Sequence, residues 1–281
     1  MKPVPFAYVR AESLEHAVES LQEHGDEAQI LAGGQSLLPA LNMRLARPGV
    51  LVDLNFAAGL DVIAVENGWI RIGALVRQAA AERAPIVHDE CPLLAESLPF
   101  VGHLVTRNRG TVCGSIAHAD AAAELPLALV VLGGEVVTSH RTVPASEFFV
   151  THFTTALESD ELVVATRWPR RAPGSGVAFE EFALRHGDFA LASAACVLRM
   201  ENDRVESVRL AVGSVTDRPE LVDAGALVGE EVQEDVVREI AATASASIDP
   251  PPSLHGSPEY RRHLIGVLVE RALTRASAAA A

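Results

Sequence analysis

Cysteine is scarce in this sequence, and its few cysteines follow no metal-binding pattern. The 281 residues include three, Cys91, Cys113 and Cys196, which are odd in number and widely separated. A disulfide framework needs paired cysteines, and zinc or iron–sulfur sites need sets of closely spaced ligands. The chain is therefore expected to hold neither, and any iron–sulfur centre that works with it must lie on another chain.

Positive charge and long apolar runs are also limited. Lysine and arginine total 23 against 37 acidic residues, and the formal net charge of −14 opposes nucleic-acid binding. The longest apolar stretch, Leu125–Gly134, is too short to span a bilayer. Met1–Phe6 has one positive charge but no continuous apolar segment, unlike a signal peptide. We therefore expect a cytoplasmic protein with no membrane span.

The composition is that of a folded protein, with 49% hydrophobic and 21% charged residues, and the length suits two domains or one large domain. Proline, glycine and charged residues cluster without periodicity at Pro169–Gly176, which indicates a boundary. We expect one domain over residues 1–172, with subdomains of about 1–56 and 57–172, and a second domain over 177–281.

Helix and strand signals alternate in the first domain. Ser13 can cap a helix that Gly25 ends, and Asn67-Gly68 between two β-rich runs indicates a hairpin. Pro39 is expected to break a short helical segment. We expect helices near residues 14–24, 37–45, 91–100 and 124–132, and strands near 29–32, 50–54, 62–66, 69–72, 136–139 and 161–168.

The second domain is expected to form a three-stranded sheet with two helices. The strand candidates are 178–185, 192–200 and 205–212, and the helix candidates are 232–248 and 258–276. The final alanines, Ala278–Ala281, have nothing to bury and are expected to fray. The fold class is therefore α+β.

Two small-residue segments carry the strongest functional signal. Ala32–Ser36 (AGGQS) follows a strand, and Thr111–Asp120 (TVCGSIAHAD) follows a polar, basic stretch. Neither contains lysine or arginine, so an anion bound there would be held by backbone N–H groups and hydroxyls, which glycine lets approach closely. Two such turns suggest a pyrophosphate clamp. Taken singly, each could be an ordinary turn, because the first lacks the spacing of a dinucleotide fingerprint and the lysine of a P-loop.

Other chemistries fit these residues less well. Ser115, His118 and Asp120 are the residue types of a nucleophilic triad, but no nucleophile elbow or oxyanion pattern accompanies them. His118, Asp120 and Glu124 are more simply explained as hydrogen-bonding groups than as metal ligands. We predict no catalytic side chain and no metal site in this chain.

Together, the two segments and their surroundings resemble the FAD-binding medium subunit of molybdenum hydroxylases, the family of aerobic carbon monoxide dehydrogenase and bacterial xanthine dehydrogenase-like enzymes. The resemblance covers nearly the whole chain. The segments that carry it are Phe6–Tyr8, Ala32–Pro39, Asn108–Thr111, Ser115–Asp120, Ala123–Pro126, Arg185–Ala190 and Tyr260–Leu264.

The resemblance implies a two-subdomain FAD-binding domain of the vanillyl-alcohol oxidase type, with a smaller C-terminal domain partly covering the flavin ring. The pyrophosphate would lie over the two turns, Glu124 would contact the cofactor, and Phe189 would lie near the isoalloxazine. The implied cofactor-binding residues are Ala32, Gly33, Gly34, Gln35, Ser36, Leu37, Thr111, Val112, Cys113, Gly114, Ser115, His118, Asp120, Glu124 and Phe189.

The resemblance also implies a function and partners. In this family a large molybdopterin subunit oxidises the substrate, a small subunit with iron–sulfur clusters relays electrons, and the FAD of the medium subunit passes them to an external acceptor. The chain would be this electron-transfer flavoprotein subunit, in a dimer of heterotrimers, with substrate and acceptor left open. A self-sufficient FAD-dependent oxidase or reductase with the same fold is the alternative, and a scaffold that has lost the nucleotide is a third.

Two positions depart from the family pattern. Cys113 stands where the first glycine of the second pair is expected, and Ala121 stands where proline often follows the aspartate. Cysteine fits at residue 113 if its φ is negative, whereas a positive φ would make it costly. A reactive or flavin-linked Cys113 is the alternative to a small buried cysteine.

Overall fold

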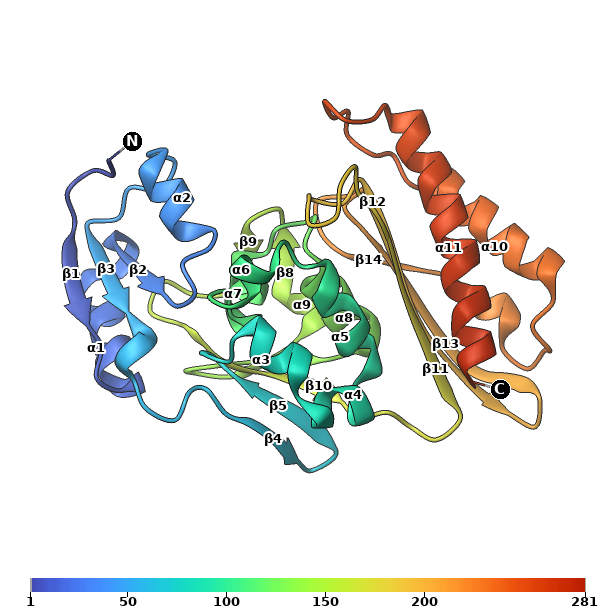
Figure 1. Cartoon of the computed structure of the whole chain (residues 1–281), viewed down its shortest axis with the longest axis horizontal. Helices are drawn as coiled ribbons and strands as arrows, with labels where there is room; N and C mark the ends of the chain where they lie inside the picture. The colour runs from blue at the N-terminus through green and yellow to red at the C-terminus, as the bar shows by residue number, and fades with distance from the viewer. Residues whose placement is uncertain (1, 281) are drawn as a thin grey trace.

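The structure is a computed structural model that describes residues 2–280, arranged as three regions along the long axis (Figure 1). An N-terminal region with a small parallel sheet lies at one end. Helices on an antiparallel sheet form the centre, and a sheet covered by two helices lies at the other end. Within residues 2–280, none of the helices combines the length and hydropathy that crossing a membrane requires.

The N-terminal region is a three-stranded parallel sheet in the order β1-β3-β2, with a helix against it. As predicted, the Ser13 side chain caps the first helix and Gly25, at φ 50°, ends it. Pro39 does not break the second helix, contrary to expectation, because it lies in the first turn, where its missing N–H has no partner to lose. The elements are β1 (Ala7–Arg10), α1 (Leu14–His24), η1 (Gly25–Glu27), β2 (Ala28–Leu31), α2 (Leu37–Asn42), β3 (Val50–Asp53) and η2 (Leu54–Phe56).

The central region packs short helices on a five-stranded sheet in the order β4-β5-β10-β6-β7. The hairpin predicted at Asn67-Gly68 is confirmed, and both residues have positive φ, 50° and 86°. The elements are β4 (Ile63–Glu66), β5 (Trp69–Gly73), α3 (Gln78–Arg83), α4 (Pro85–Glu90), α5 (Pro92–Ser97), η3 (Leu98–Phe100), α6 (Leu104–Arg107), α7 (Val112–His118), α8 (Glu124–Leu132), β6 (Glu135–Thr138), β7 (Thr142–Pro144), α9 (Ala145–Phe148), β8 (Phe149–Thr151), β9 (Thr154–Thr155) and β10 (Val163–Pro169).

The C-terminal sheet has four antiparallel strands, so the prediction of three was wrong. The missed strand is only three residues long, too short for a periodic pattern, and it pairs with Leu210–Val212. The predicted fraying was also wrong for Ala278–Ala280, which continue the last helix, whereas Ala281 lies outside the described residues. The elements are β11 (Ser175–Phe182), β12 (Ala192–Glu201), β13 (Arg204–Gly213), β14 (Glu220–Val222), η4 (Gly225–Leu227), α10 (Glu234–Ser247) and α11 (Pro258–Ala280).

The two faces of the C-terminal sheet belong to different cores. Val177 and Phe179 of β11 point into the core of the central region, and Phe179 packs on Phe100 with ring centroids 5.4 Å apart. Ala178, between them, faces the core under α10 and α11. Alternation along the strand thus ties the sheet to both neighbours. α8 of the central region packs against β12 and β13, and the interface between α8 and the C-terminal sheet is called the seam.

Candidate functional site

The two small-residue turns, far apart in the sequence, lie in direct contact. A Cβ added at Gly33 would lie 2.6 Å from the carbonyl oxygen of Arg109 and 2.7 Å from the Cα of Gly110. Both are backbone atoms that cannot move aside, so only glycine allows this approach. The structure therefore brings Ala32–Ser36 against the start of Thr111–Asp120, as the clamp hypothesis requires.

The first turn is an open loop between β2 and α2. Gly34 has a left-handed φ of 72°, and the Gln35 side chain donates to the carbonyl oxygen of Gly33 over 3.2 Å. Gln35 and Ser36 are exposed, Ala32 and Leu37 are half-buried, and the Ser36 side chain does not cap α2. Exposed polar groups and backbone are thus available for a ligand.

The second turn is the start of α7 and is largely buried. The Thr111 side chain is the N-cap, and its Oγ1 accepts a hydrogen bond from the N–H of Gly114 over 3.0 Å. Val112 and Cys113 are buried, whereas Gly114 and Ser115 are half-buried. Here the accessible groups are the backbone and the Ser115 hydroxyl.

Cys113 meets the condition that its substitution for glycine requires. It lies within α7, and its φ is not positive. Its Sγ donates to the Ile72 carbonyl over 3.4 Å and lies 3.8 Å from the Thr166 hydroxyl. Burial raises the pKa of this thiol to about 12. The geometry favours a small core cysteine over a reactive or flavin-linked one.

His118 and Asp120 contact the β8–β9 hairpin. The His118 ring packs on Phe153 at a centroid distance of 4.8 Å, and burial lowers the pKa of His118. Asp120 accepts from the N–H of Ala122 over 2.9 Å, and its Oδ1 lies 3.5 Å from Nε2 of His152. These contacts are with Ala122, His152 and Phe153, so they do not join His118 or Asp120 to the first turn. In the described part of the chain, no three His, Cys, Asp or Glu residues are placed to hold a metal ion.

Glu124, the first residue of α8, is a buried carboxyl at the seam with the C-terminal sheet. Burial, and secondarily the charge of Asp120, raises its pKa to about 7. Glu181 of β11 is its neighbour across the seam, with a buried Oε2 that has no hydrogen-bond partner. Burial and the charge of Glu124 raise the pKa of Glu181 to about 9. Sequence reasoning missed Glu181, because only the strand register shows that it faces inward.

Phe189 lies in the loop between β11 and β12 and is 72% exposed. The same loop reaches the central region, since a Cβ added at Gly187 would lie 2.9 Å from the carbonyl oxygen of Gly102 and 2.5 Å from Nδ1 of His103. The loop therefore packs near the segment that leads to the second turn. The structure does not bring Phe189 itself against either turn.

Two polar residues that sequence reasoning missed link the turns. Asn55 donates to the carbonyl oxygen of Ala32 over 2.9 Å, and Arg77 donates to that of Arg109 over 2.7 Å. Arg77 also donates to Oδ1 of Asn55 over 2.6 Å. One signal was available for Asn55, which lies two residues after the buried parallel strand β3, where binding groups often gather.

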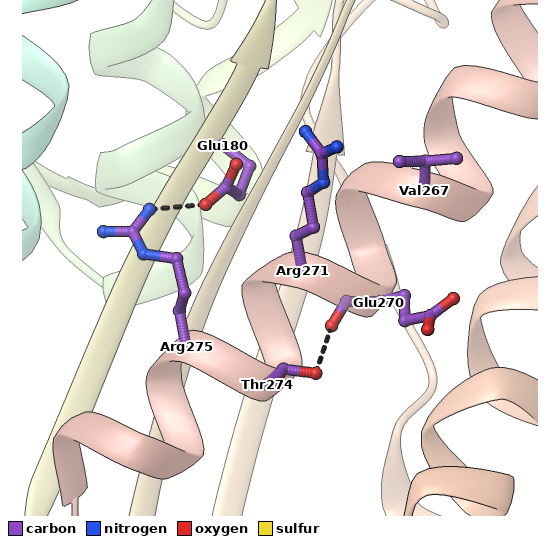
Figure 2. Close-up of a pocket in the computed structure, with 6 residues that line it drawn as sticks. All are labelled: Glu180, Val267, Glu270, Arg271, Thr274 and Arg275. Atoms are coloured by element: carbon purple, nitrogen blue, oxygen red, sulfur yellow. Dashed lines mark hydrogen bonds and ion pairs between the residues drawn. The ribbon is translucent and has the colours of Figure 1, made fainter.

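A pocket of about 390 Å³ lies elsewhere, beside α11 in the C-terminal region. Figure 2 shows the side chains around it, with Arg275 paired to Glu180 and Thr274 bonded within its own helix. None of the predicted site residues lines it. Its lining residues are Glu180, Val267, Glu270, Arg271, Thr274 and Arg275. The candidate cofactor site is therefore the contact between the turns, not this pocket.

Comparisons with known proteins show the family of the chain. The family described as FAD binding domain in molybdopterin dehydrogenase matches residues 4–171, and CO dehydrogenase flavoprotein C-terminal domain matches residues 177–276. The chain is 40% identical to the 6-hydroxypseudooxynicotine dehydrogenase complex subunit alpha of Paenarthrobacter nicotinovorans, over 98% of this chain and 96% of that one. It is 34% identical to the carbon monoxide dehydrogenase medium chain of Hydrogenophaga pseudoflava, over 98% of both.

Solved structures match over the same length. A chain of carbon monoxide dehydrogenase from Hydrogenophaga pseudoflava, in a form lacking the Mo-pyranopterin moiety, superposes with a TM-score of 0.97 at 35% identity, covering 100% of both chains. A chain of quinoline 2-oxidoreductase from Pseudomonas putida 86 gives 0.94 at 36% identity, covering 100% of this chain and 99% of that one. The likeness therefore includes the arrangement of all three regions.

Proposed function

The chain belongs to the family of FAD-binding medium subunits of molybdenum hydroxylases, and on this premise we propose that it is the FAD-carrying electron-transfer subunit of such a complex. It is a flavoprotein subunit of an oxidoreductase, as its relatives are. A bound flavin would supply the redox chemistry. The chain's own residues would bind and orient it and need supply no nucleophile or general base.

The contact between the two turns is the observation that carries this proposal. Gly33 packs on the backbone of Arg109 and Gly110 without room for a Cβ, which brings the backbones of the two turns close enough to serve one diphosphate. We propose Gly33, Gly34 and Gly114 nearest the pyrophosphate. Val112 and Cys113 are buried and would contribute backbone atoms only. Ala32, Gln35, Ser36, Leu37, Thr111, Ser115, His118 and Asp120 complete the proposed set around the turns.

The flavin ring would lie toward the C-terminal region. Glu124 is buried at the seam with that region, and the β11–β12 loop that carries Phe189 packs beside Gly102. This arrangement supports Glu124 as a cofactor contact and Phe189 as a residue near the isoalloxazine. We also propose domains of about 1–172, divided near residue 56, and 177–281, with a first domain of the vanillyl-alcohol oxidase type; the family matches over residues 4–171 and 177–276 support the two ranges.

The proposed partners are a large molybdopterin subunit that oxidises the substrate and a small iron–sulfur subunit that feeds electrons to this chain. The assembly would be a dimer of heterotrimers in the cytoplasm. The matches to medium chains of multisubunit dehydrogenases over almost their full length support this division of labour. The external acceptor would approach the flavin on this chain.

Purification of this chain alone and with its native partners tests the proposal. The isolated chain is expected to bind FAD, with a flavin absorption spectrum, and to show no substrate oxidation. A tag on this chain is expected to capture two further chains, with iron–sulfur absorption and molybdenum. A stable homo-oligomer that oxidises substrate without other chains would instead support the self-sufficient oxidase or reductase, and a chain that stays colourless with FAD would support the scaffold.

A further inference from the structure

Arg77 lies between the two turns and is fixed there by its own backbone. It follows β5 and precedes α3, and it forms an antiparallel bridge with Thr111. On either side of it, the N–H of Gln78 donates to the Gly110 carbonyl over 2.9 Å, and the N–H of Val112 donates to the Val76 carbonyl over 3.1 Å. The Arg77 backbone is therefore joined to the second turn, and its side chain extends from this position toward the first turn.

The guanidinium of Arg77 reaches toward the first turn. Its Nη1 donates to the Arg109 carbonyl over 2.7 Å, and its Nη2 donates to Oδ1 of Asn55 over 2.6 Å. Asn55 in turn donates to the Ala32 carbonyl over 2.9 Å. Two hydrogen-bonded side chains thus connect a carbonyl in front of the second turn to a carbonyl at the start of the first.

The acceptor side of this link is also held in place. Oδ1 of Asp53 accepts from the backbone N–H of Asn55 over 2.9 Å and from its side chain over 2.6 Å, and Oδ2 accepts from the Tyr8 hydroxyl over 2.7 Å. Asn55 is therefore oriented with its Oδ1 toward Arg77. The Arg77 guanidinium thus donates to two uncharged oxygens, the Arg109 carbonyl and Oδ1 of Asn55.

We propose that Arg77 is a positioning residue that, through Asn55, fixes the spacing between the two turns for the diphosphate of FAD. This inference rests on the proposed function. Arginine suits the role because its planar fork can serve two acceptors in fixed directions, whereas lysine offers one compact point of donation. The first turn has no side-chain cap of its own and depends on such a link.

FAD affinity of the whole chain, measured by quenching of flavin fluorescence, is the first test. Arg77→Gln and Arg77→Lys are each expected to raise the Kd by about tenfold or more, because each loses one end of the link. Asn55→Ala is expected to act similarly, and the double variant Arg77→Gln/Asn55→Ala to do no more than the stronger single one. Arg71→Gln is the matched control, since Arg71 has the same charge on nearby β5 and only a long ion pair of 3.9 Å. It is expected to stay within about twofold.

Hydrogen exchange of the FAD-free chain separates positioning from general stability. Arg77→Gln is expected to speed exchange in the peptide covering residues 32–36 and to leave the peptide covering 112–118 unchanged. Full affinity in Arg77→Lys, additive effects in the double variant, or equal acceleration in both peptides would overturn the inference. If the unmodified chain bound no FAD, the proposed function would fail; if it bound FAD and Arg77→Gln bound it equally well, only this inference would fail.

Discussion

The two turns that meet at the candidate site are built in opposite ways. The second turn is the capped start of α7, with Thr111 and Cys113 buried and Gly114 bonded to the Thr111 hydroxyl. The first is a loop, exposed at Gln35 and Ser36, whose following helix has no side-chain cap. Its position depends on Gly33 fitting against a neighbouring backbone and on side chains from elsewhere in the chain.

This difference means that the second turn is the more rigid and the first turn the more accessible. A helix start whose side chains are buried holds its backbone by local hydrogen bonds, so its geometry survives without a partner. A loop between a strand and a short helix needs contacts from outside to hold one conformation. We infer that the second turn is the fixed half of the site and the first turn the adjustable half.

Gly33→Ala should have the largest effect. The added Cβ would lie 2.6 Å from the Arg109 carbonyl oxygen, so the first turn must move away from the second. FAD affinity is expected to fall by at least about a hundredfold. Gly114→Ala should cost less, since its Cβ would meet a side-chain atom, the Thr111 hydroxyl, at 2.5 Å. Isothermal titration of FAD into each variant measures the difference.

Gly266→Ala is the control for this comparison. Gly266 lies in α11, its added Cβ would meet nothing closer than 3.6 Å, and its φ is not positive. Alanine should therefore favour the helix slightly and leave FAD affinity unchanged. A Gly33→Ala chain that bound FAD as tightly as the Gly266→Ala chain would contradict the contact as the basis of the site.

The surroundings of the two turns should respond oppositely to pH. Beyond the second turn, burial raises the pKa of Glu124 from 4.5 to about 7, so its contribution to stability is complete below pH 4.5 and is lost as pH rises through 7. Beside the first turn, burial acts to raise the pKa of Asp53, but hydrogen bonds from Asn55 and Tyr8 outweigh it and lower the pKa. The Asp53 contribution is therefore present at neutral pH and is lost only as pH falls through that lowered value.

Denaturant unfolding of the FAD-free chain between about pH 5.5 and 8 measures the Glu124 effect as the difference between the unmodified chain and Glu124→Gln. The unmodified chain is expected to lose about 2 kcal/mol of unfolding free energy from this group over that range, and Glu124→Gln to remove the loss. Glu181→Gln should reduce the slope further, since the pKa of Glu181 is raised to about 9. A slope that stayed the same in Glu124→Gln would mean that Glu124 is ionised in the fold throughout.

Capping gives a smaller contrast between the turns. Thr111→Ala removes the acceptor for the Gly114 N–H and is expected to lower the unfolding free energy by about 1 kcal/mol. Ser36→Ala, at the matching position before α2, removes no cap and should change it by less than about 0.5 kcal/mol. Urea unfolding compares the two, with Thr111→Ser as the variant that should keep stability. Equal losses would show that both turns are capped alike.

Local patterns explain why much of the fold was predictable. The apolar run between Glu124 and Gly133 fixed α8 at both ends, and Asn67-Gly68 fixed the central hairpin through its positive φ values. The fourth strand, Glu220–Val222, carries no such pattern, since pairing with β13 alone makes it a strand. Periodicity cannot detect an element that exists only through its neighbour.

In the candidate site, too, local sequence patterns could be predicted and tertiary contacts could not. The glycines of both turns were found from sequence, because small residues at a strand end and before a helix are visible signals. The Arg77–Asn55 link was not found, because it joins side chains across regions and depends on tertiary packing. Glu181 was missed for a related reason, since the adjacent acidic pair Glu180-Glu181 reads as exposed until the strand turns one of them inward.

Thiol reactivity should show the smallest effect, and it bears directly on the fixed half of the site. Cys113 is buried in the second turn with its pKa raised to about 12 by burial, and burial raises those of Cys91 and Cys196 to about 12 as well. Ellman's reagent at neutral pH is expected to label none of the three in the folded chain and all of them in denaturant. Adding FAD should not change this result, because a rigid second turn keeps the thiol in the core whether or not a ligand is bound. Labelling of Cys113 in the FAD-free chain that FAD suppresses would show instead that the second turn opens, and the two halves would then differ in sequence but not in mobility.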